Sequence, residues 1–247
     1  MEEWRARVVG KRGPSGGELV LDSAVVRDGD YTGLKLARFV SIGSRFSACQ
    51  FESMKISMMS AGAGLVQSEY VDCSFDGTQM EMHPGGFARF VNCSFRDVLI
   101  THWTVTACDM VDCVFSGKIK SATFNGMVDP NTRKEYGKIR NEFVRNDFSG
   151  AEMVDVAFRT GIDLRMQVLP AGPDYCYVEN GASSVEGALT LIDGWEDDEL
   201  RRGAKAVLDR QKELVLHGQQ QLFLQRTTGR NSRFWLQLCA SLRGERW

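Results

Sequence analysis

The side chains of this chain that could bind a metal ion or act as nucleophiles are mainly seven cysteines and three histidines. A zinc site needs cysteine and histidine ligands at short, defined spacings, and the chain has no C-x-x-C pair. The closest cysteines, Cys108 and Cys113, are five residues apart. The sequence also lacks a glycine-rich phosphate loop and a nucleophile elbow. We therefore expect no metal site, no cofactor and no catalytic residues.

The cysteines follow a repeat instead. Three segments, 71–75, 91–95 and 111–115, each begin with valine, end with phenylalanine and carry cysteine in the middle. A bulky apolar residue also returns at nearly every fifth position from Leu65 to Phe115, and the residue two positions earlier is usually small. A helix would need steps of three and four residues, and a strand would alternate by two. The five-residue period predicts a chain that turns a corner every five residues and closes a square coil every twenty.

Stacked coils would place equivalent residues about 4.8 Å apart, like neighbouring strands of a sheet. The inward columns expected from this register contain Cys49, Cys73, Cys93 and Cys113 beside Phe51, Phe75, Phe95 and Phe115. Free cysteine behaves as a small buried hydrophobic residue. These thiols are therefore expected to fill the core in the reduced form rather than to build a disulfide framework.

On these segments the chain resembles the pentapeptide-repeat family, whose motif is a small residue, a polar residue, Leu or Phe, and two variable residues. Matching segments are 73–75, 88–90, 93–95, 113–115 and 151–153. The resemblance implies a mainly β fold, a right-handed quadrilateral β-helix of about five or six coils. It also implies a candidate partner, because some members mimic duplex DNA and occupy the DNA-binding surface of DNA gyrase.

The pattern divides the chain into four parts: an N-terminal lead or cap (1–18), the β-helix (19–165) with an insertion at about 125–142, a linker or capping loop (166–194), and a helical element (195–247). The repeat phase slips between Ile56 and Leu65, which predicts a short bulge at a corner. Helical spacing predicts one helix after 195 and a second from Asn231 or Ser232. Because exposed strand edges promote polymerisation, this element is expected to cap the solenoid, form a dimer, or do both.

A DNA mimic needs rows of carboxylates, and the outward columns provide a test. The candidate DNA-mimic face consists of Glu69, Asp72, Asp109 and Asp112. Arg89 would stack between two of these carboxylates and Asn92 between the other two, which favours pairing of opposite charges across strands. Eleven acidic and nine basic residues lie between 21 and 124, so this region is only weakly acidic for a DNA mimic.

Two cationic segments are further candidates for partner binding. The insertion carries Arg133, Lys134, Tyr136 and Arg140, and the C-terminal element carries Arg226, Arg230, Arg233 and Trp235. Arginine interleaved with aromatic residues can bind phosphates and stack on bases, which keeps nucleic-acid binding open. A solvated helix face or the rim of a dimer interface explains the same residues. An enzyme hypothesis, with a small site around His83, Trp103 and the insertion, stands third.

Composition adds few constraints. The chain of 247 residues has a net charge of −2, which gives no global attraction to nucleic acid. Its charged start is unlike a signal peptide and no apolar run reaches transmembrane length, so we expect a cytoplasmic protein. The sequence favours a non-enzymatic binding protein, with gyrase-type topoisomerase the partner that the resemblance supplies. The alternative is a scaffold that dimerises through its C-terminal helices.

Overall fold

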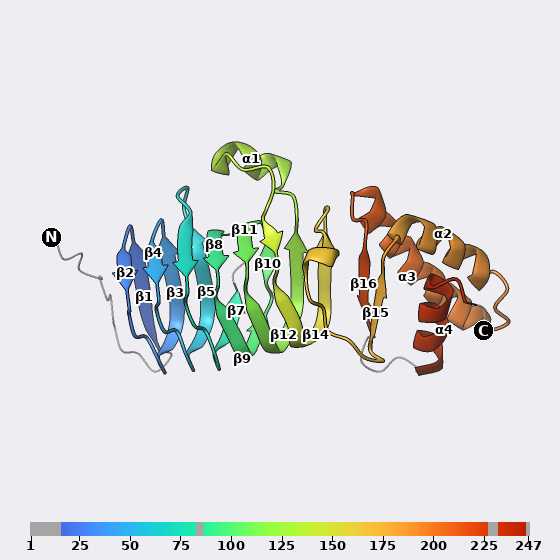
Figure 1. Ribbon diagram of the computed structural model, residues 1–247, viewed down its shortest axis with the longest axis horizontal. Coiled ribbons are helices and arrows are strands. Elements are labelled where there is room, and N and C mark those ends of the chain that lie inside the picture. The colour runs from blue at the N-terminus through green and yellow to red at the C-terminus, as the bar shows by residue number, and fades with distance from the viewer. Residues whose placement is uncertain (1–15, 83–85, 227–231, 246–247) are drawn as a thin grey trace.

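The chain winds into a parallel β-solenoid, and three of its helices gather at the C-terminal end (Figure 1). The computed structural model describes residues 16–82, 86–226 and 232–245. An eight-stranded sheet covers part of the coil. Its strands follow the order β1 (Gly17–Asp22), β3 (Lys35–Ile42), β5 (Lys55–Ala63), β7 (Gln79–Met82), β9 (Ser94–Thr101), β12 (Val114–Asn125) and β10 (Thr104–Val105), with β14 (Asp147–Arg159) also pairing with β12.

A six-stranded parallel sheet forms another side of the coil. Its strands follow the order β13 (Phe143–Val144), β11 (Ala107–Val111), β8 (Phe87–Val91), β6 (Ser68–Val71), β4 (Arg45–Ser47) and β2 (Val25–Arg27). Isolated parallel bridges from Asp30 through Gln50 and Ser74 to Ser94 mark a further side. Neighbouring strands within these series come from successive coils. The mainly β repeat solenoid expected from the five-residue period is therefore confirmed.

The corners of the coil explain why the period is five. At one corner, six stacked residues have left-handed backbone angles, with φ between +51° and +55°: Asp28, Ala48, Asp72, Asn92, Asp112 and Arg145. Asp and Asn adopt this conformation more readily than most residues because their short polar side chains bond locally. The long strands β12 and β14 also turn through left-handed residues, Ser121 and Asp155. Each of the six corner residues directly follows the last residue of a strand, whereas Ser121 and Asp155 redirect the chain within a strand.

Stacked aromatic rings fill the interior. One column runs through Tyr31, Phe51, Phe75, Phe95, Phe115 and Phe148, with successive ring centroids 4.5–4.9 Å apart. The rings lie nearly parallel because the sheet ladder fixes their separation. Beside this column lie the buried free thiols of Cys49, Cys73, Cys93 and Cys113. Trp103 is also buried, edge-on to Phe124, where the other coils place smaller side chains.

The repeat is first interrupted after β5. Phe51 stacks on Phe75, which is 24 residues later rather than 20, so one coil is longer than the others. The extra length forms a loop at Gly64–Gln67, in which Leu65 is 62% exposed and Val66 is 65% exposed. The expectation that Leu65 belongs to the inward repeat was wrong. The chain leaves the coil here to make a loop, and the inward position passes to Tyr70.

The second interruption lies between Asn125, the last residue of β12, and Phe143, the first of β13. It carries helix α1 (Pro130–Tyr136). The Asp129 side chain accepts a hydrogen bond from the backbone N–H of Asn131. Pro130 occupies the first turn, where a backbone N–H would have no partner within the helix. Gly137 ends the helix with a φ of +61°. The excursion is thus a loop that carries one capped helix and projects from the coil (Figure 1).

The C-terminal part differs from the expected linker followed by helices. Residues 166–194 contain strand β15 (Tyr175–Val178) and helix α2 (Gly181–Ile192), which follow a short 3-10 helix (Leu164–Met166). Strand β15 pairs antiparallel with β16 (Leu222–Gln225), and α2 packs against α3 (Asp198–Leu216) and α4 (Ser232–Leu242). The helical element is confirmed, and it shares one apolar core with the segment that was taken for a linker.

Glutamine side chains join this part to the last coil. Gln219 Oε1 accepts from the backbone N–H groups of Gly161 and Ile162, each at 3.2 Å. Gln221 Oε1 accepts from the N–H of Leu164 at 3.1 Å, and Gln225 Oε1 from that of Val156 at 2.9 Å. No further coil supplies acceptors for these N–H groups, so the glutamines satisfy a strand edge that would otherwise lie open.

Candidate interaction surface

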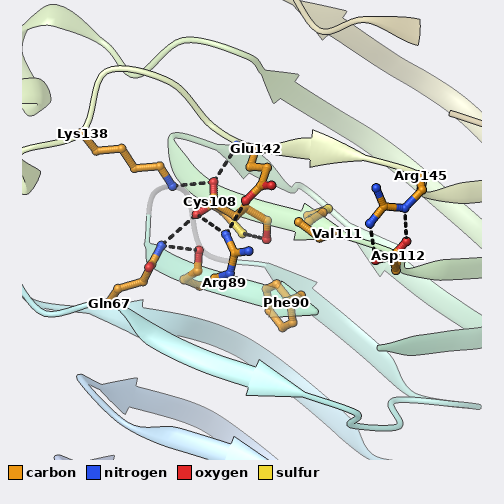
Figure 2. Close-up of polar contacts among 12 residues, drawn as sticks. Gln67, Arg89, Phe90, Cys108, Val111, Asp112, Lys138, Glu142 and Arg145 are labelled. Carbon is orange, nitrogen blue, oxygen red and sulfur yellow. Dashed lines mark hydrogen bonds and ion pairs between the residues drawn. The ribbon is translucent and has the colours of Figure 1, made fainter. Parts of the chain in front are cut away.

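A polar cluster on the solenoid joins Gln67, Arg89, Lys138 and Glu142 (Figure 2). The carboxylate that they share belongs to Asp109, in strand β11. Its carboxylate is only 8% exposed and lies 2.7 Å from Lys138 Nζ. It accepts a hydrogen bond from Gln67 Nε2 at 3.1 Å and one from the backbone N–H of Glu142 at 2.6 Å. Arg89 approaches at 3.5 Å and pairs more closely with Glu142, at 2.6 Å. One carboxylate therefore holds groups from three separate segments, the first loop, strand β8 and the second excursion.

These contacts connect the two interruptions of the repeat. Gln67 ends the first loop, and Lys138 follows helix α1 of the second excursion. Both excursions rise from the same edge of the solenoid (Figure 1). Tyr136 packs on the ring of Phe87 at 4.8 Å, and Lys138 Nζ lies 5.7 Å above that ring. The excursions are thus anchored to the same patch of sheet by polar and aromatic contacts.

The anchoring leaves large aliphatic side chains in solvent. Leu65 and Val66 precede Gln67 and are 62% and 65% exposed, and Ile139 follows Lys138 and is 62% exposed. We call the side chains of Leu65, Val66 and Ile139 the insertion surface. Exposed large apolar side chains on an ordered frame can form contact sites for other macromolecules.

The expected acidic face carries little free charge. Asp109 is buried by its partners, which corrects its assignment to an exposed face. Glu69 pairs with Arg45 at 3.4 Å, and Asp72 accepts from the Asn92 side chain at 2.6 Å. Asp112 forms a two-pronged pair with Arg145, at 2.6 and 2.7 Å. The Arg145 guanidinium lowers the pKa of the Asp112 carboxyl. Stacking thus pairs each of these carboxylates with a donor one coil away.

The cationic candidates of the insertion have different surroundings. Arg133 Nε donates to the carbonyl of Val128 at 2.8 Å, and Lys134 is exposed on α1. Tyr136 is half-buried against Phe87, and Arg140 is exposed beside the last coil. Arg133 and Tyr136 therefore help to hold the excursion in place.

The C-terminal candidates are largely engaged within the chain. Trp235 is 4% exposed, and its indole N–H donates to the carbonyl of Pro173 at 2.7 Å. Arg226 pairs with Asp174 at 2.8 Å. Arg233 is exposed at the start of α4, and Arg230 lies outside the described residues. Trp235 and the neighbouring Phe234 are instead core residues of the cap, and Phe223 packs in the core of the solenoid.

The chemistry proposed for the enzyme hypothesis is not assembled in the described residues. Burial raises the pKa of the Cys108 thiol, which makes it a poorer nucleophile. His83 lies outside the described part of the chain, and Trp103 is fully packed among phenylalanine rings. Within residues 16–82, 86–226 and 232–245, no group of three or more His, Cys, Asp and Glu is placed to hold a metal ion. Among the helices described, none is long and apolar enough to cross a membrane.

No protein-family model and no curated protein matches the sequence. Two solved structures of trypsin-treated variants of QnrB1, a plasmid-mediated fluoroquinolone resistance protein, align with 61% of this chain and with 76% and 77% of their own lengths. Their sequence identities are 13% and 15%, and their TM-scores are 0.26 and 0.24. This chain is a parallel β-solenoid with a five-residue repeat. Its five-residue period, left-handed corners and stacked small and large columns establish the fold independently of those structures.

Sequence reasoning missed Gln67 and the capping glutamines, and it did not predict that Lys138 of the insertion pairs with Asp109. The excursion with helix α1 separates Asp109 from Lys138, and its path could not be predicted. Their pairing therefore corresponds to no local pattern in the sequence. The run Gln219–Gln221 directly before the apolar Leu222–Leu224 was the one visible signal. Amide side chains can replace main-chain partners at an open strand edge, and such a run beside a buried strand is compatible with that role.

Proposed function

We propose that this protein is a non-enzymatic binding protein that recognises another macromolecule through the insertion surface. The observation that carries the proposal is the shared anchor of the two excursions at Asp109. The core of the stacked coils is built by residues outside both excursions. Here both excursions project from the same edge and hold Leu65, Val66 and Ile139 in solvent.

The partner we propose is a gyrase-type topoisomerase, as the resemblance to pentapeptide-repeat proteins suggests. The mode of recognition we propose is contact with the insertion surface rather than mimicry of DNA by a row of carboxylates. The pairing of Glu69, Asp72 and Asp112 with neighbouring donors supports this choice. A partner that reads DNA-like charge would meet a surface whose charges are largely compensated.

A DNA supercoiling assay with purified gyrase tests both parts of the proposal. The full chain is titrated into the assay, with and without a quinolone, beside the triple variant L65S/V66S/I139S. The control is Leu216→Ser, which removes a side chain that is 68% exposed at the end of α3. We expect the parent and the control to inhibit supercoiling or protect it from the drug at micromolar protein, and the triple variant to lose at least tenfold in potency.

The outcomes separate the partner from the surface. No effect of the folded parent on gyrase rejects the proposed partner. An effect of equal potency in the triple variant keeps the partner and rejects the insertion surface. A loss caused by Glu69→Lys and Asp72→Lys together, larger than that of the triple variant, would restore DNA mimicry as the mode of recognition.

The assembly alternative has less structural support. The apolar stripe expected to form a dimer contact on α4 is buried inside the cap, with Phe234, Leu238 and Leu242 at most 5% exposed. Leu236, at 46%, is the large aliphatic side chain of α4 that is most exposed. Dimerisation through the C-terminal helices therefore stays a prediction, which light scattering of the full chain tests directly.

A further inference from the structure

The outer edge of the last coil is covered unequally. Along β14 the hairpin of β15 and β16 closes it, with Gln225 bonded to Val156 and the Tyr175 hydroxyl accepting from the N–H of Met153. Along β13 the next segment of chain forms a 3-10 helix instead of a strand. A cavity of about 450 Å³ lies there, bounded by Arg140–Val144, by parts of 161–166 and by parts of 218–221. Its volume falls in the range of ligand-binding pockets.

Main-chain groups of β13 point toward this cavity. The carbonyls of Glu142 and Val144 accept from Met110 and Asp112, so these two residues face the preceding coil. Successive residues of a strand direct their peptide groups to opposite sides, and Phe143 therefore faces away from the sheet. Its carbonyl accepts from Gln167 Nε2 at 2.9 Å, and its N–H lies on the same side of the strand, where Phe143 lines the cavity. An added strand finds one ready donor there.

The side chains around the cavity leave one uncompensated charge. Glu142 is paired with Arg89 at 2.6 Å, and Asp163 is held by Arg165 through two hydrogen bonds of 2.9 and 2.8 Å. The Arg165 guanidinium lowers the pKa of the Asp163 carboxyl, so it stays ionised and paired. Arg140 is exposed on the rim and has no ion pair among the described residues. A carboxylate is the ligand group that complements a free guanidinium best.

We propose that this cavity binds a short, extended peptide that carries an acidic side chain. The peptide adds to β13 as a strand, with a carbonyl on the N–H of Phe143 and its carboxylate on Arg140. Strand addition supplies affinity through the main chain, and the paired charge supplies selectivity. The cavity contains none of the three side chains of the insertion surface, so this site stands whether or not the proposed function does.

The test uses the full chain, immobilised, and two pools of pentapeptides, Ac-Xaa-Xaa-Asp-Xaa-Xaa-NH2 and the same pool with Lys at the centre. Peptides retained from the Asp pool are identified by mass spectrometry, resynthesised with a fluorophore and titrated by anisotropy. Matched protein variants are Arg140→Glu and Lys134→Glu, which make the same charge change at two exposed positions. A matched peptide carries N-methyl groups, which block main-chain pairing. The backbone amide signal of Phe143 is followed by NMR.

We expect the Asp pool to be retained over the Lys pool. The selected peptide should bind at least tenfold more weakly to Arg140→Glu and, once N-methylated, to the parent, with Lys134→Glu within twofold of the parent. The amide signal of Phe143 should shift on binding. Equal retention of both pools, equal binding to Arg140→Glu, or an unmoved Phe143 signal overturns the proposal. Full competition by equimolar succinate reduces the site to a carboxylate pocket and overturns the peptide assignment.

Discussion

Removal of the Asp109 carboxylate should destabilise the protein far more than removal of its closest cation. Asp109→Ala leaves the ammonium group of Lys138, 14% exposed, without its partner, and it also deprives Gln67 and the N–H of Glu142 of their acceptor. Breaking a buried ion pair from one side costs about 3–5 kcal/mol. The excursion can swing out and rehydrate Lys138, so we expect a loss near the lower limit, about 3 kcal/mol.

Lys138→Met has a smaller expected cost. Methionine keeps much of the apolar stem over Phe87, and Asp109 retains Gln67, the N–H of Glu142 and the more distant Arg89 as donors. A carboxylate that keeps such partners loses about 1 kcal/mol. The two variants should therefore differ by about 2 kcal/mol, in the direction that marks Asp109 rather than Lys138 as the centre of the cluster.

Urea unfolding followed by circular dichroism measures this difference, and hydrogen exchange of residues 128–140 locates it. Faster exchange confined to that segment in Asp109→Ala would mean that the excursion has detached while the coils remain folded. The reasoning is refuted if the two variants lose equal free energy of unfolding, or if Lys138→Met loses more. Either result would mean that the donors other than Lys138 contribute nothing to holding Asp109.

Three further predictions concern the core, the cap and the surface. Phe95→Ala opens a cavity in the middle of the aromatic column and should cost about 3–5 kcal/mol in urea unfolding; a curve that overlays the parent would contradict the stacking. Gln219→Ala leaves two backbone N–H groups of the last coil without acceptors and should cost about 2–3 kcal/mol, whereas exposed Gln220→Ala should stay within about 0.5 kcal/mol. Because Arg145 lowers the pKa of Asp112 in the folded state, that pair stabilises the protein fully above the ordinary aspartate pKa of about 3.9 and loses its effect as the pH falls further. Asp112→Asn should therefore reduce the acid sensitivity of the midpoint below about pH 4, and unchanged sensitivity would argue against the pair.

The core could be predicted from sequence because stacking turns a linear period into a column. Phe75, Phe95 and Phe115 lie twenty residues apart, and the five-residue sub-period between them favours a coil with four sides in which they stack. Leu65 shows the limit of that reasoning, because it has the five-residue spacing of the inward positions but is exposed to solvent. A four-residue interruption moves the inward position without changing the local composition, and the stacking of Phe51 on Phe75 and the pairing of Phe46 with Tyr70 reveal the shift.

The cap and the interaction surface were less accessible to sequence reasoning. The segment 166–194 has the prolines and glycines of a linker, yet its helix α2 is stabilised by packing on α3 and α4 and not by local propensity. Arg226 and Trp235 had the composition of a nucleic-acid contact. Whether such side chains face solvent or a core depends on long-range packing, which a single sequence does not encode in any local pattern.

The placement of the insertion surface follows from the energetics of a stacked coil. A carboxylate column with a separation of about 4.8 Å would accumulate repulsion of about 1 kcal/mol per step even in water. One outward column of the six-stranded sheet avoids this cost by alternating charge, through Arg45, Glu69, Arg89 and Asp109. The alternation leaves this column nearly neutral and chemically repetitive. A distinctive contact surface therefore has to leave the repeat, and an excursion that leaves it needs a fixed anchor to be preorganised for binding. Asp109 is the last charge of that alternating run before the second excursion, which explains why the anchor of both excursions lies at this position.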